Sequence, residues 1–287
     1  MNKNNKILVT GASGKTGSRI AKRLTDLGFA VRTAGRRTPS SLAAGEHAFF
    51  DWFDESTHAA ALTNVDTMYL VSPVAMIDPS PIVLPFLEKA LAAGVRRVVF
   101  LSSASVPEEG PVFGKVHRAI RRHVPEWAVL RPSYFMQNFT EEHHRAQIMN
   151  DGTMVTATGS GRVGFVDADD IAEVGVRALI DSQPHNTDHI ITGPQSLTYA
   201  EVGAIIGAAS GRTIHHVHVS TEELANRLMS FGMAEDYARF LAGMDEGIRL
   251  HGTEDLVSDT VKRITGRPPK SLEEFAGEHA SVWNLKL

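Results

Sequence analysis

KILVTGASGKTGSRIAKRLTDLGFAVRTAGRR, residues 6–37, is the stretch that decides the fold. An apolar run opens it, and three glycines follow at three-residue spacing: Gly11, Gly14 and Gly17. A helical pattern comes next, ends at Gly28 and is followed by a second apolar run. Strand, glycine turn, helix and strand form the unit that binds a dinucleotide, because the glycines let the backbone approach a pyrophosphate. We therefore expect a dinucleotide site here, against the alternative of a plain tight turn in an α/β protein.

The composition is that of an ordinary globular protein. The chain has 287 residues, 43% of them hydrophobic, enough for one large or two modest domains with a sizeable core. The formal net charge of −4 gives no indication of a nucleic-acid or membrane partner, and no apolar run approaches the length of a membrane span. There is no cysteine, which excludes disulfides, thiolate metal sites and cysteine nucleophiles. The N-terminal residues lack the apolar stretch of a signal peptide, so we expect a cytoplasmic protein.

Strand-like and helix-like segments alternate through the first half of the chain, which predicts a parallel sheet covered on both faces. The strands are expected at residues 7–10, 30–33, 47–50, 67–71, 97–101 and 128–130. The helices between them are expected at residues 16–27, 56–62, 81–93 and 115–123. The pattern loosens after residue 132, and we expect the C-terminal half to form a cap interleaved with the sheet, with an approximate boundary at residue 150.

The residues after the second strand indicate which nucleotide binds. In NAD-binding versions of the fold, an acidic residue there hydrogen-bonds the ribose hydroxyls, but this chain has Gly35, Arg36 and Arg37. A carboxylate would repel a 2′-phosphate, whereas a guanidinium can bind it with two parallel hydrogen bonds. We therefore expect NADP(H) as the cofactor, and a solvated turn is the alternative interpretation of the two arginines.

Other polar residues follow the later strands, at the carboxyl edge of the expected sheet. Asp51 follows the third strand, where adenine would lie, and could accept a hydrogen bond from the adenine amino group. A simple turn residue is an equally good interpretation of Asp51. Ser72 and Pro73 follow the fourth strand, and Ser102 and Ser103 follow the fifth, beside the expected path of the nicotinamide.

The chain resembles the atypical short-chain dehydrogenase/reductases of the NmrA-like group over nearly its whole length. That group includes fungal ergot-alkaloid reductases, a triphenylmethane dye reductase, quinone reductases and NADP sensors without catalytic activity. The glycine stretch and its basic residues are most similar to the ergot-type branch. The matching stretches are VTGASGKTG at 9–17, VRTAGRR at 31–37, VVFLSSASV at 98–106, LRPSYFMQNF at 130–139, FVDADDIAEVGVRAL at 165–179, ITGPQSLTYAEV at 191–202 and TGRPPKSLEEF at 265–275.

The resemblance implies an α/β fold, a Rossmann-type doubly wound parallel sheet with a smaller α/β C-terminal substrate lobe. The NADP(H)-binding domain would span residues 1–150 and the substrate lobe residues 151–287, partly interleaved with the sheet. By the family pattern, the cofactor residues are Ser13, Lys15 and Thr16 at the pyrophosphate, Arg36 at the 2′-phosphate, and Ser72, Pro73, Pro132 and Phe135 at the nicotinamide.

The usual proton donor of short-chain dehydrogenases is missing from this chain. These enzymes use a serine and a Tyr-x-x-x-Lys motif, in which the tyrosine passes a proton and the lysine lowers its pKa. Ser102 could fill the serine position and Lys115 the lysine position, but Pro111 stands where the tyrosine belongs. Lys115 would then bind the cofactor ribose or polarise the substrate, and His117 could donate a proton near neutral pH. The alternatives are a surface lysine and a histidine on the helix surface.

The missing tyrosine favours hydride transfer to an acceptor that needs little acid catalysis, such as an iminium ion, a quinone, a conjugated alkene or a cationic dye. Aromatic rings and thioethers suit a planar acceptor, although most such residues are expected to belong to the core. The candidates for the substrate pocket are Met76, Tyr134, Phe135, Met136, Met154, Phe165, Met229, Met233, Tyr237 and Phe240.

We expect no metal site. His215, His216 and His218 lie in an expected strand, whose alternation directs His215 away from the other two. The acidic residues at 167–170 are expected to cap the N-terminus of a helix.

Two hypotheses for the function follow. The first is an NADPH-dependent reductase of a small, planar organic acceptor, with the oligomeric state left open. The second is a non-catalytic NADP(H) sensor that binds a partner protein. An epimerase or dehydratase acting on a nucleotide sugar is a third possibility, which the missing Tyr-x-x-x-Lys motif disfavours.

Overall fold

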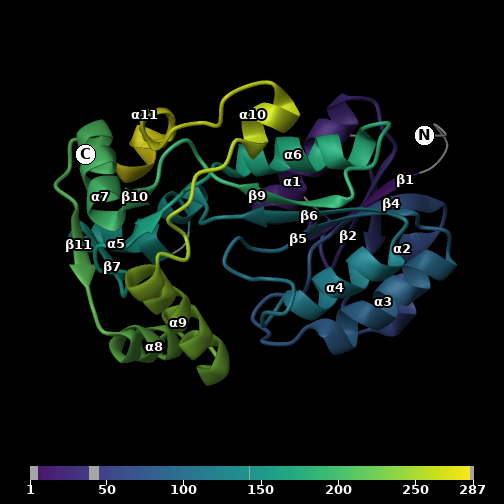
Figure 1. Ribbon diagram of the computed structural model, residues 1–287, viewed down its shortest axis with the longest axis horizontal. Coiled ribbons are helices and arrows are strands. Elements are labelled where there is room, and N and C mark those ends of the chain that lie inside the picture. Colours follow the sequence, from purple (N-terminus) through teal and green to yellow (C-terminus); the bar gives the residue numbers. More distant parts are fainter. Residues whose placement is uncertain (1–5, 39–44, 142, 285–287) are drawn as a thin grey trace. The chain divides into compact units, whose positions relative to one another are not determined.

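A seven-stranded sheet with the strand order β3-β2-β1-β4-β5-β6-β9 organises the first part of the chain (Figure 1). Neighbouring strands from β3 to β6 pair in parallel. The order reverses its direction between β1 and β4, and doubly wound sheets bind ligands at the carboxyl ends of such a pair. The expected Rossmann-type fold is therefore confirmed. The strands are β1 (Lys6–Thr10), β2 (Val31–Gly35), β3 (Glu46–Phe49), β4 (Val65–Leu70), β5 (Arg97–Leu101), β6 (Glu126–Pro132) and β9 (Thr187–Ile191).

In the computed structural model, residues 6–38, 45–141 and 143–284 are described, without the side chain of His143. The chain divides into two compact units. The first unit consists of Met1–Arg131 and Ala168–Ile190, and the second of Pro132–Asp167 and Ile191–Leu287. Residues 132–150, which the sequence pattern assigned to the first domain, thus group with the second unit, because the chain leaves the sheet at the end of β6.

Helices cover both faces of the sheet in the first unit. α1 (Lys15–Asp26) and α6 (Ala168–Ile180) pack side by side on one face, and α2 (His58–Leu62), preceded by the short helix η1 (Glu55–Thr57), α3 (Ser80–Ala92) and α4 (Gly114–His123) cover the other (Figure 1). The inner strands β1, β4 and β5 are mostly buried, because helices cover both sides of the sheet there. Leu8, Met68 and Phe100 are fully buried members of this core.

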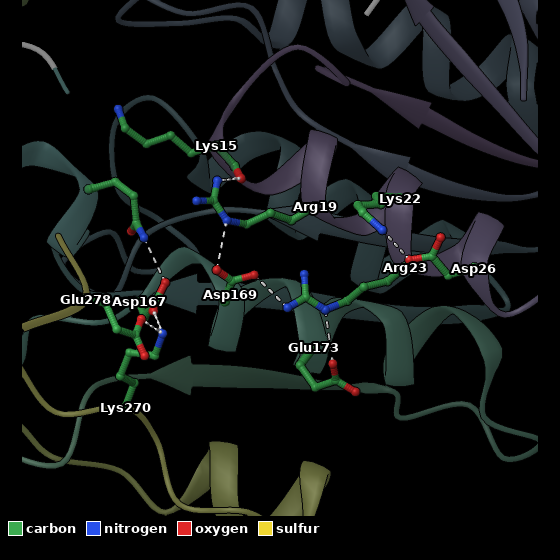
Figure 2. Close-up of polar contacts among 11 residues, drawn as sticks. Lys15, Arg19, Lys22, Arg23, Asp26, Asp167, Asp169, Glu173, Lys270 and Glu278 are labelled. Carbon is green, nitrogen blue, oxygen red and sulfur yellow. Dashed lines mark hydrogen bonds and ion pairs between the residues drawn. The ribbon is translucent and has the colours of Figure 1, made fainter. Parts of the chain in front are cut away.

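Close packing of α1 against α6 depends on a glycine and on ion pairs. A Cβ atom on Gly175 of α6 would lie 2.9 Å from the Cδ1 atom of Ile20, so a side chain there would require the end of the Ile20 side chain to move. Figure 2 shows the polar contacts between the two helices, in which Asp169 at the start of α6 pairs with Arg19 at 3.3 Å and with Arg23 at 2.6 Å. The expected acidic start of this helix is present, and its charges are shared with α1.

The second unit contains short strands and several helices. β7 pairs with β11 in parallel, and β8 pairs with β10 in antiparallel orientation. Its core is rich in aromatic side chains, including Phe139, Phe165, Phe275 and Trp283. The elements are η2 (Met136–Phe139), α5 (His143–Asp151), β7 (Thr153–Thr156), β8 (Arg162–Val163), β10 (Leu197–Thr198), α7 (Tyr199–Ser210), β11 (His215–His218), α8 (Thr221–Ser230), α9 (Glu235–His251), α10 (Thr260–Thr265) and α11 (Leu272–Trp283).

The ends of these helices follow from local sequence. Gly252 and Gly266 end α9 and α10 in the left-handed conformation, with φ angles of 59° and 79°, which glycine adopts without steric cost. At the start of α11, Ser271 and Glu274 form the reciprocal hydrogen bonds of a capping box. Within the described ranges, no helix combines the length and the apolar character needed to cross a bilayer.

Candidate functional site

The turn between β1 and α1 brings two stretches of backbone unusually close. Gly11 has a φ angle of +63°, and its carbonyl oxygen accepts a hydrogen bond from the N–H group of Gly14 at 2.9 Å. A Cβ atom on Gly17 would lie 2.3 Å from that same oxygen, so α1 can start here only if residue 17 is glycine. Gly14 provides no side-chain cap for α1. The first turn of α1 is therefore open to an anion, in line with the general behaviour of helix N-termini.

A cavity of about 380 Å³ lies beside this turn, entirely within the first unit, and we call it the crevice cavity. It is formed where β1, β2, β3 and β4 end, which is the carboxyl edge of the sheet. The sequence predicted several of its lining residues, and Trp52, Phe53, Val71 and Val74 join them. The predicted residues that line it are Gly11, Ser13, Gly14, Arg36, Asp51, Ser72 and Pro73.

The polar groups of the crevice cavity are few. Among the described residues that line it, Arg36 is the basic one and is exposed, and Asp51 is the acidic one. One carboxylate oxygen of Asp51 accepts a hydrogen bond from the N–H group of Phe53 at 3.0 Å, which gives Asp51 a turn-forming contact as well. The hydroxyl of Ser72 is buried and has no hydrogen-bond partner within the described residues. A buried hydroxyl without a partner is costly, so a ligand that supplies one would be favoured.

Four other predicted cofactor residues between β1 and the end of β2 do not line the crevice cavity: Lys15, Thr16, Gly17 and Arg37. Thr16 is buried, and its hydroxyl accepts a hydrogen bond from the Tyr69 hydroxyl at 2.9 Å, so it points into the protein. Burial raises the pKa of Tyr69, which therefore remains a neutral donor. Lys15 and Arg37 are near the cavity in sequence but are not part of its lining. The expected phosphate contact of Thr16 thus competes with an existing internal hydrogen bond.

Ser102 occupies the position after β5 that Ser72 occupies after β4. The two strands pair in parallel, with Leu70 opposite Phe100, so the two serines end neighbouring strands at matching positions. The hydroxyl of Ser102 is also buried and without a hydrogen-bond partner within the described residues. Two such hydroxyls on adjacent strands are what a ligand lying along this edge would satisfy.

Lys115 and His117, the other two catalytic candidates, have structural partners. Lys115 is exposed and forms an ion pair with Asp78. His117 is 1% exposed, and its Nε2 atom lies 2.9 Å from the Oδ1 atom of Asp188, which also pairs with Arg131 at 3.4 Å. The alternative of a histidine on the helix surface is therefore wrong. Neither Lys115 nor His117 is among the residues that line the crevice cavity.

A second cavity of about 240 Å³ lies entirely within the second unit, and we call it the aromatic cavity. Aromatic and aliphatic side chains dominate its lining, and Asp245 is its acidic residue. Of the predicted substrate residues, only Tyr134 lines it. The lining consists of Tyr134, Asn138, His144, Val155, Thr156, Tyr199, Leu224, Leu228, Leu241 and Asp245.

The comparison with known proteins identifies the family. The model of the NmrA-like family matches residues 3–276. The chain belongs to the NmrA-like family. The expected resemblance, including the ergot-alkaloid-type reductases, is thereby confirmed.

Similar proteins cover the full length of this NmrA-like chain. The Bacillus subtilis (strain 168) protein named uncharacterized oxidoreductase YesF is 53% identical over 283 residues, which are 99% of this chain and 98% of that protein. Agroclavine dehydrogenase of Claviceps fusiformis is 36% identical over 291 residues, with 98% of this chain and 99% of that protein covered. These full-length relatives are named as redox enzymes, and this chain is an oxidoreductase of the same family.

A solved structure with the same fold is the Citrobacter sp. triphenylmethane reductase complexed with NADP(H). Its TM-score is 0.77 at 23% identity, and the match covers 96% of this chain and 99% of that chain. At this level of identity the likeness concerns the fold alone.

Several predicted residues of the NmrA-like chain line neither cavity. Pro132 is buried at the end of β6, and Phe135 forms a bridge with Val166, so both lie in the second unit and outside the lining of the crevice cavity. Met154 and Phe165, expected at the substrate, are instead fully buried in the core of the second unit. Other candidates do not line the aromatic cavity either: Met76, Met136, Met229, Met233, Tyr237 and Phe240.

The sequence contains a signal for Asp245, although no motif includes this residue. The buried face of α9 is formed by Ala238, Ala242, Asp245 and Ile248, spaced as one side of a helix. A carboxylate on an otherwise apolar stripe is an anomaly, because carboxylates are almost never fully buried without a partner. In β11, the Nε2 atom of His216 lies within hydrogen-bond distance of the Thr156 hydroxyl, at 2.7 Å. The described residues contain no group of three or more side chains that could hold a metal ion.

Proposed function

We propose that this chain is an NADPH-dependent reductase that transfers a hydride to a small, planar organic acceptor. The observation that carries the proposal is the crevice cavity, which combines the glycine turn with Arg36 at the end of β2. Bound NADPH would supply the hydride. The residues of the chain bind and orient both reactants.

The residues of the crevice cavity fit an NADP(H) molecule. Gly17 and Gly11 bring the start of α1 against the end of β1, and no side chain caps this helix, as a pyrophosphate site requires. Arg36 is exposed at the far end and could bind a 2′-phosphate, where NAD-specific proteins carry an acidic residue. The unpartnered hydroxyl of Ser72 offers a hydrogen bond near the switch between β1 and β4. These features support the cofactor assignment independently of the relatives.

The reaction must proceed without the usual tyrosine. Pro111 occupies its position in the sequence, and Lys115 is engaged with Asp78. The chain therefore suits an acceptor whose carbon is electrophilic already, so that binding and orientation supply most of the rate enhancement. Iminium ions, quinones, conjugated alkenes and cationic dyes meet this condition.

The experiment compares NADPH and NADH binding by calorimetry. We expect the protein to bind NADPH more tightly, and Arg36→Ala to weaken NADPH binding by about tenfold to a hundredfold while NADH binding stays unchanged. Arg37→Ala is the matched control, since Arg37 does not line the crevice cavity. Equal affinities for the two cofactors in the unaltered protein would contradict the proposal.

The second candidate function, a non-catalytic NADP(H) sensor, is favoured by the same missing proton donor. NADPH oxidation measured against a panel of quinones, cyclic iminium ions and triphenylmethane dyes separates the two. Turnover with any of them supports the reductase. Tight NADPH binding without turnover across the panel supports the sensor.

A further inference from the structure

Asp245 is a buried carboxylate without a cationic partner in the described part of the chain. Its exposed fraction is 8%, and its Oδ2 atom accepts one hydrogen bond, from the N–H group of Ala157 at 2.9 Å. None of the described residues lining the aromatic cavity is a lysine or an arginine. Buried carboxylates are normally paired with a positive charge, so a cationic ligand next to Asp245 would be stabilised.

The surroundings of Asp245 in the aromatic cavity are mainly aromatic and aliphatic side chains. Tyr134 and Tyr199 both line the aromatic cavity, and Leu224, Leu228 and Leu241 complete its apolar part. The Tyr199 ring packs against two histidine rings. Its centroid lies 5.6 Å from that of His216 and 5.7 Å from that of His144.

Burial of Asp245 has an energetic consequence that a ligand could remove. Loss of hydration raises its pKa to about 6, and the single hydrogen bond from Ala157 only partly offsets this. At neutral pH most molecules therefore carry a desolvated negative charge in an apolar cavity. A buried charge costs less when a counter-charge lies next to it, and ring faces attract cations as well.

We propose that the aromatic cavity binds a flat organic cation, with the positive charge next to Asp245 and the ring plane against Tyr134 and Tyr199. If the proposed function is correct, this cation is the hydride acceptor. The cavity then selects among the acceptor classes above: iminium ions and cationic heteroaromatic rings are preferred over quinones and neutral alkenes.

The chemistry of such an acceptor explains why no proton donor is required. The hydride forms a new C–H bond at the electrophilic carbon, and the π electron pair of the C=N⁺ bond moves to nitrogen. The acceptor becomes a neutral amine while NADPH becomes NADP⁺, so no proton enters the balance. The product has lost its attraction for Asp245, which favours its release.

This role predicts a particular kinetic effect for Asp245. Because the positive charge disappears as the hydride adds, the carboxylate stabilises the bound substrate more than the transition state. Removing its charge should therefore raise KM for a cationic acceptor without lowering kcat.

The test uses two probes of matched shape, the cation 1-methylquinolinium and the neutral 1-methylnaphthalene, titrated into the full chain without cofactor. We expect the cation to bind at least about tenfold more tightly, and Asp245→Asn to remove this preference while leaving the neutral probe unaffected. Asparagine keeps the shape and an oxygen for the N–H group of Ala157. Glu246→Gln is the matched control, because it removes the same charge from the next residue of α9, which pairs with Arg249 at 3.1 Å.

The outcomes are distinct. Equal binding of the two probes, or an unchanged preference in Asp245→Asn, would overturn the proposal. A loss of kcat on a neutral quinone in Asp245→Asn, with KM unchanged, would also overturn it and identify Asp245 as a proton donor. Because the titration contains no cofactor, a failure of NADPH binding would refute the proposed function and leave the cation site standing. An unchanged thermal unfolding temperature, or a higher one, confirms that the variant is folded.

Discussion

At residue 17 the structure has room for a hydrogen atom and for nothing larger. The 2.3 Å separation between a hypothetical Cβ atom and the Gly11 oxygen is far below any van der Waals contact. Gly175 illustrates the same point less severely, since the neighbouring atom there is the end of the flexible Ile20 side chain. Single atoms therefore determine both the shape of the dinucleotide turn and the approach of the two helices behind it.

The residue-scale prediction concerns the stability contributed by Asp245. Its pKa of about 6 in the folded protein lies above the ordinary value of 3.8, so the folded state holds the proton more tightly than the unfolded state. The charge is therefore destabilising above pH 6, and the penalty disappears as the pH falls through 6 towards 4. We expect Asp245→Asn to raise the free energy of unfolding at pH 7.5 by roughly 1–3 kcal/mol.

Urea unfolding at several pH values measures this effect. The advantage of Asp245→Asn over the unaltered protein should shrink between pH 6 and pH 4 and vanish below pH 4. An advantage that does not depend on pH would show that burial of the charge is not its cause.

Among the elements, the strand β5 and the helix α6 are joined by a buried arginine. The guanidinium of Arg97 is 6% exposed, pairs with Glu126 at 2.7 Å, and donates hydrogen bonds to the carbonyl oxygens of Leu179 and Asp181 at 3.0 and 2.7 Å. These carbonyl groups lie at the C-terminal end of α6, where a positive charge also complements the helix dipole. Arg97 thus stabilises the packing of α6 against the sheet.

We expect Arg97→Ala to lower the free energy of unfolding by about 2–4 kcal/mol, because it leaves a carboxylate and two carbonyl groups without their partner. Arg263→Ala is the control, since Arg263 pairs with Asp259 at 3.6 Å with both side chains largely exposed. Its effect should stay within about 0.5 kcal/mol. Chemical denaturation of both variants measures the difference, and similar losses would refute the role of Arg97.

Elements with a strong local pattern could be predicted from the sequence. The strand Arg97–Leu101 begins and ends at the expected residues, and the helix Gly114–His123 differs from the expected helix at 115–123 by one residue. The expected helix at 56–62 is instead divided into the short helix Glu55–Thr57 and the helix His58–Leu62. Local patterns report hydrophobic period and turn chemistry, and those decide long elements better than short ones.

The two cavities differ in how far the sequence predicts them. The crevice cavity was predictable because its residues follow consecutive strands of one sheet, so their positions in the sequence determine their shared edge. The aromatic cavity collects side chains from α5, β7, α7, α8 and α9, and no local motif relates them. Met154 and Phe165 show the limit, since the type of side chain alone does not distinguish a core position from a cavity wall.

At the scale of the whole molecule, the two compact units do not correspond to two continuous stretches of the chain. Residues 168–190 return to the first unit after an excursion of the chain into the second. They supply α6, which packs on α1, β4 and β5, and β9, which lies next to β6. A cut at residue 150 would therefore remove the strand β9 and one of the two helices that cover one face of the sheet.

We expect a protein of residues 1–150 to lack cooperative thermal unfolding and to bind NADPH weakly or not at all. A protein in which residue 131 is joined to residues 168–190 by a flexible Gly/Ser linker should recover cooperative unfolding, because it contains the whole first unit. Circular dichroism and calorimetry provide the two measurements. Cooperative unfolding and full NADPH affinity of the shorter protein would show that α6 and β9 are dispensable.

The return of residues 168–190 also imposes an order of events during synthesis. When residue 131 leaves the ribosome, Ile20 and its neighbours on α1 still lack the α6 surface against which they pack. The ribosome adds roughly 5–20 residues per second, so the missing segment follows within seconds. The second unit waits longer, since its core includes Trp283 near the very end of the chain. The nascent protein thus exposes apolar surface of the first unit until residue 190 has emerged, and of the second unit until residue 283 has emerged. This interval is when it depends most on chaperones.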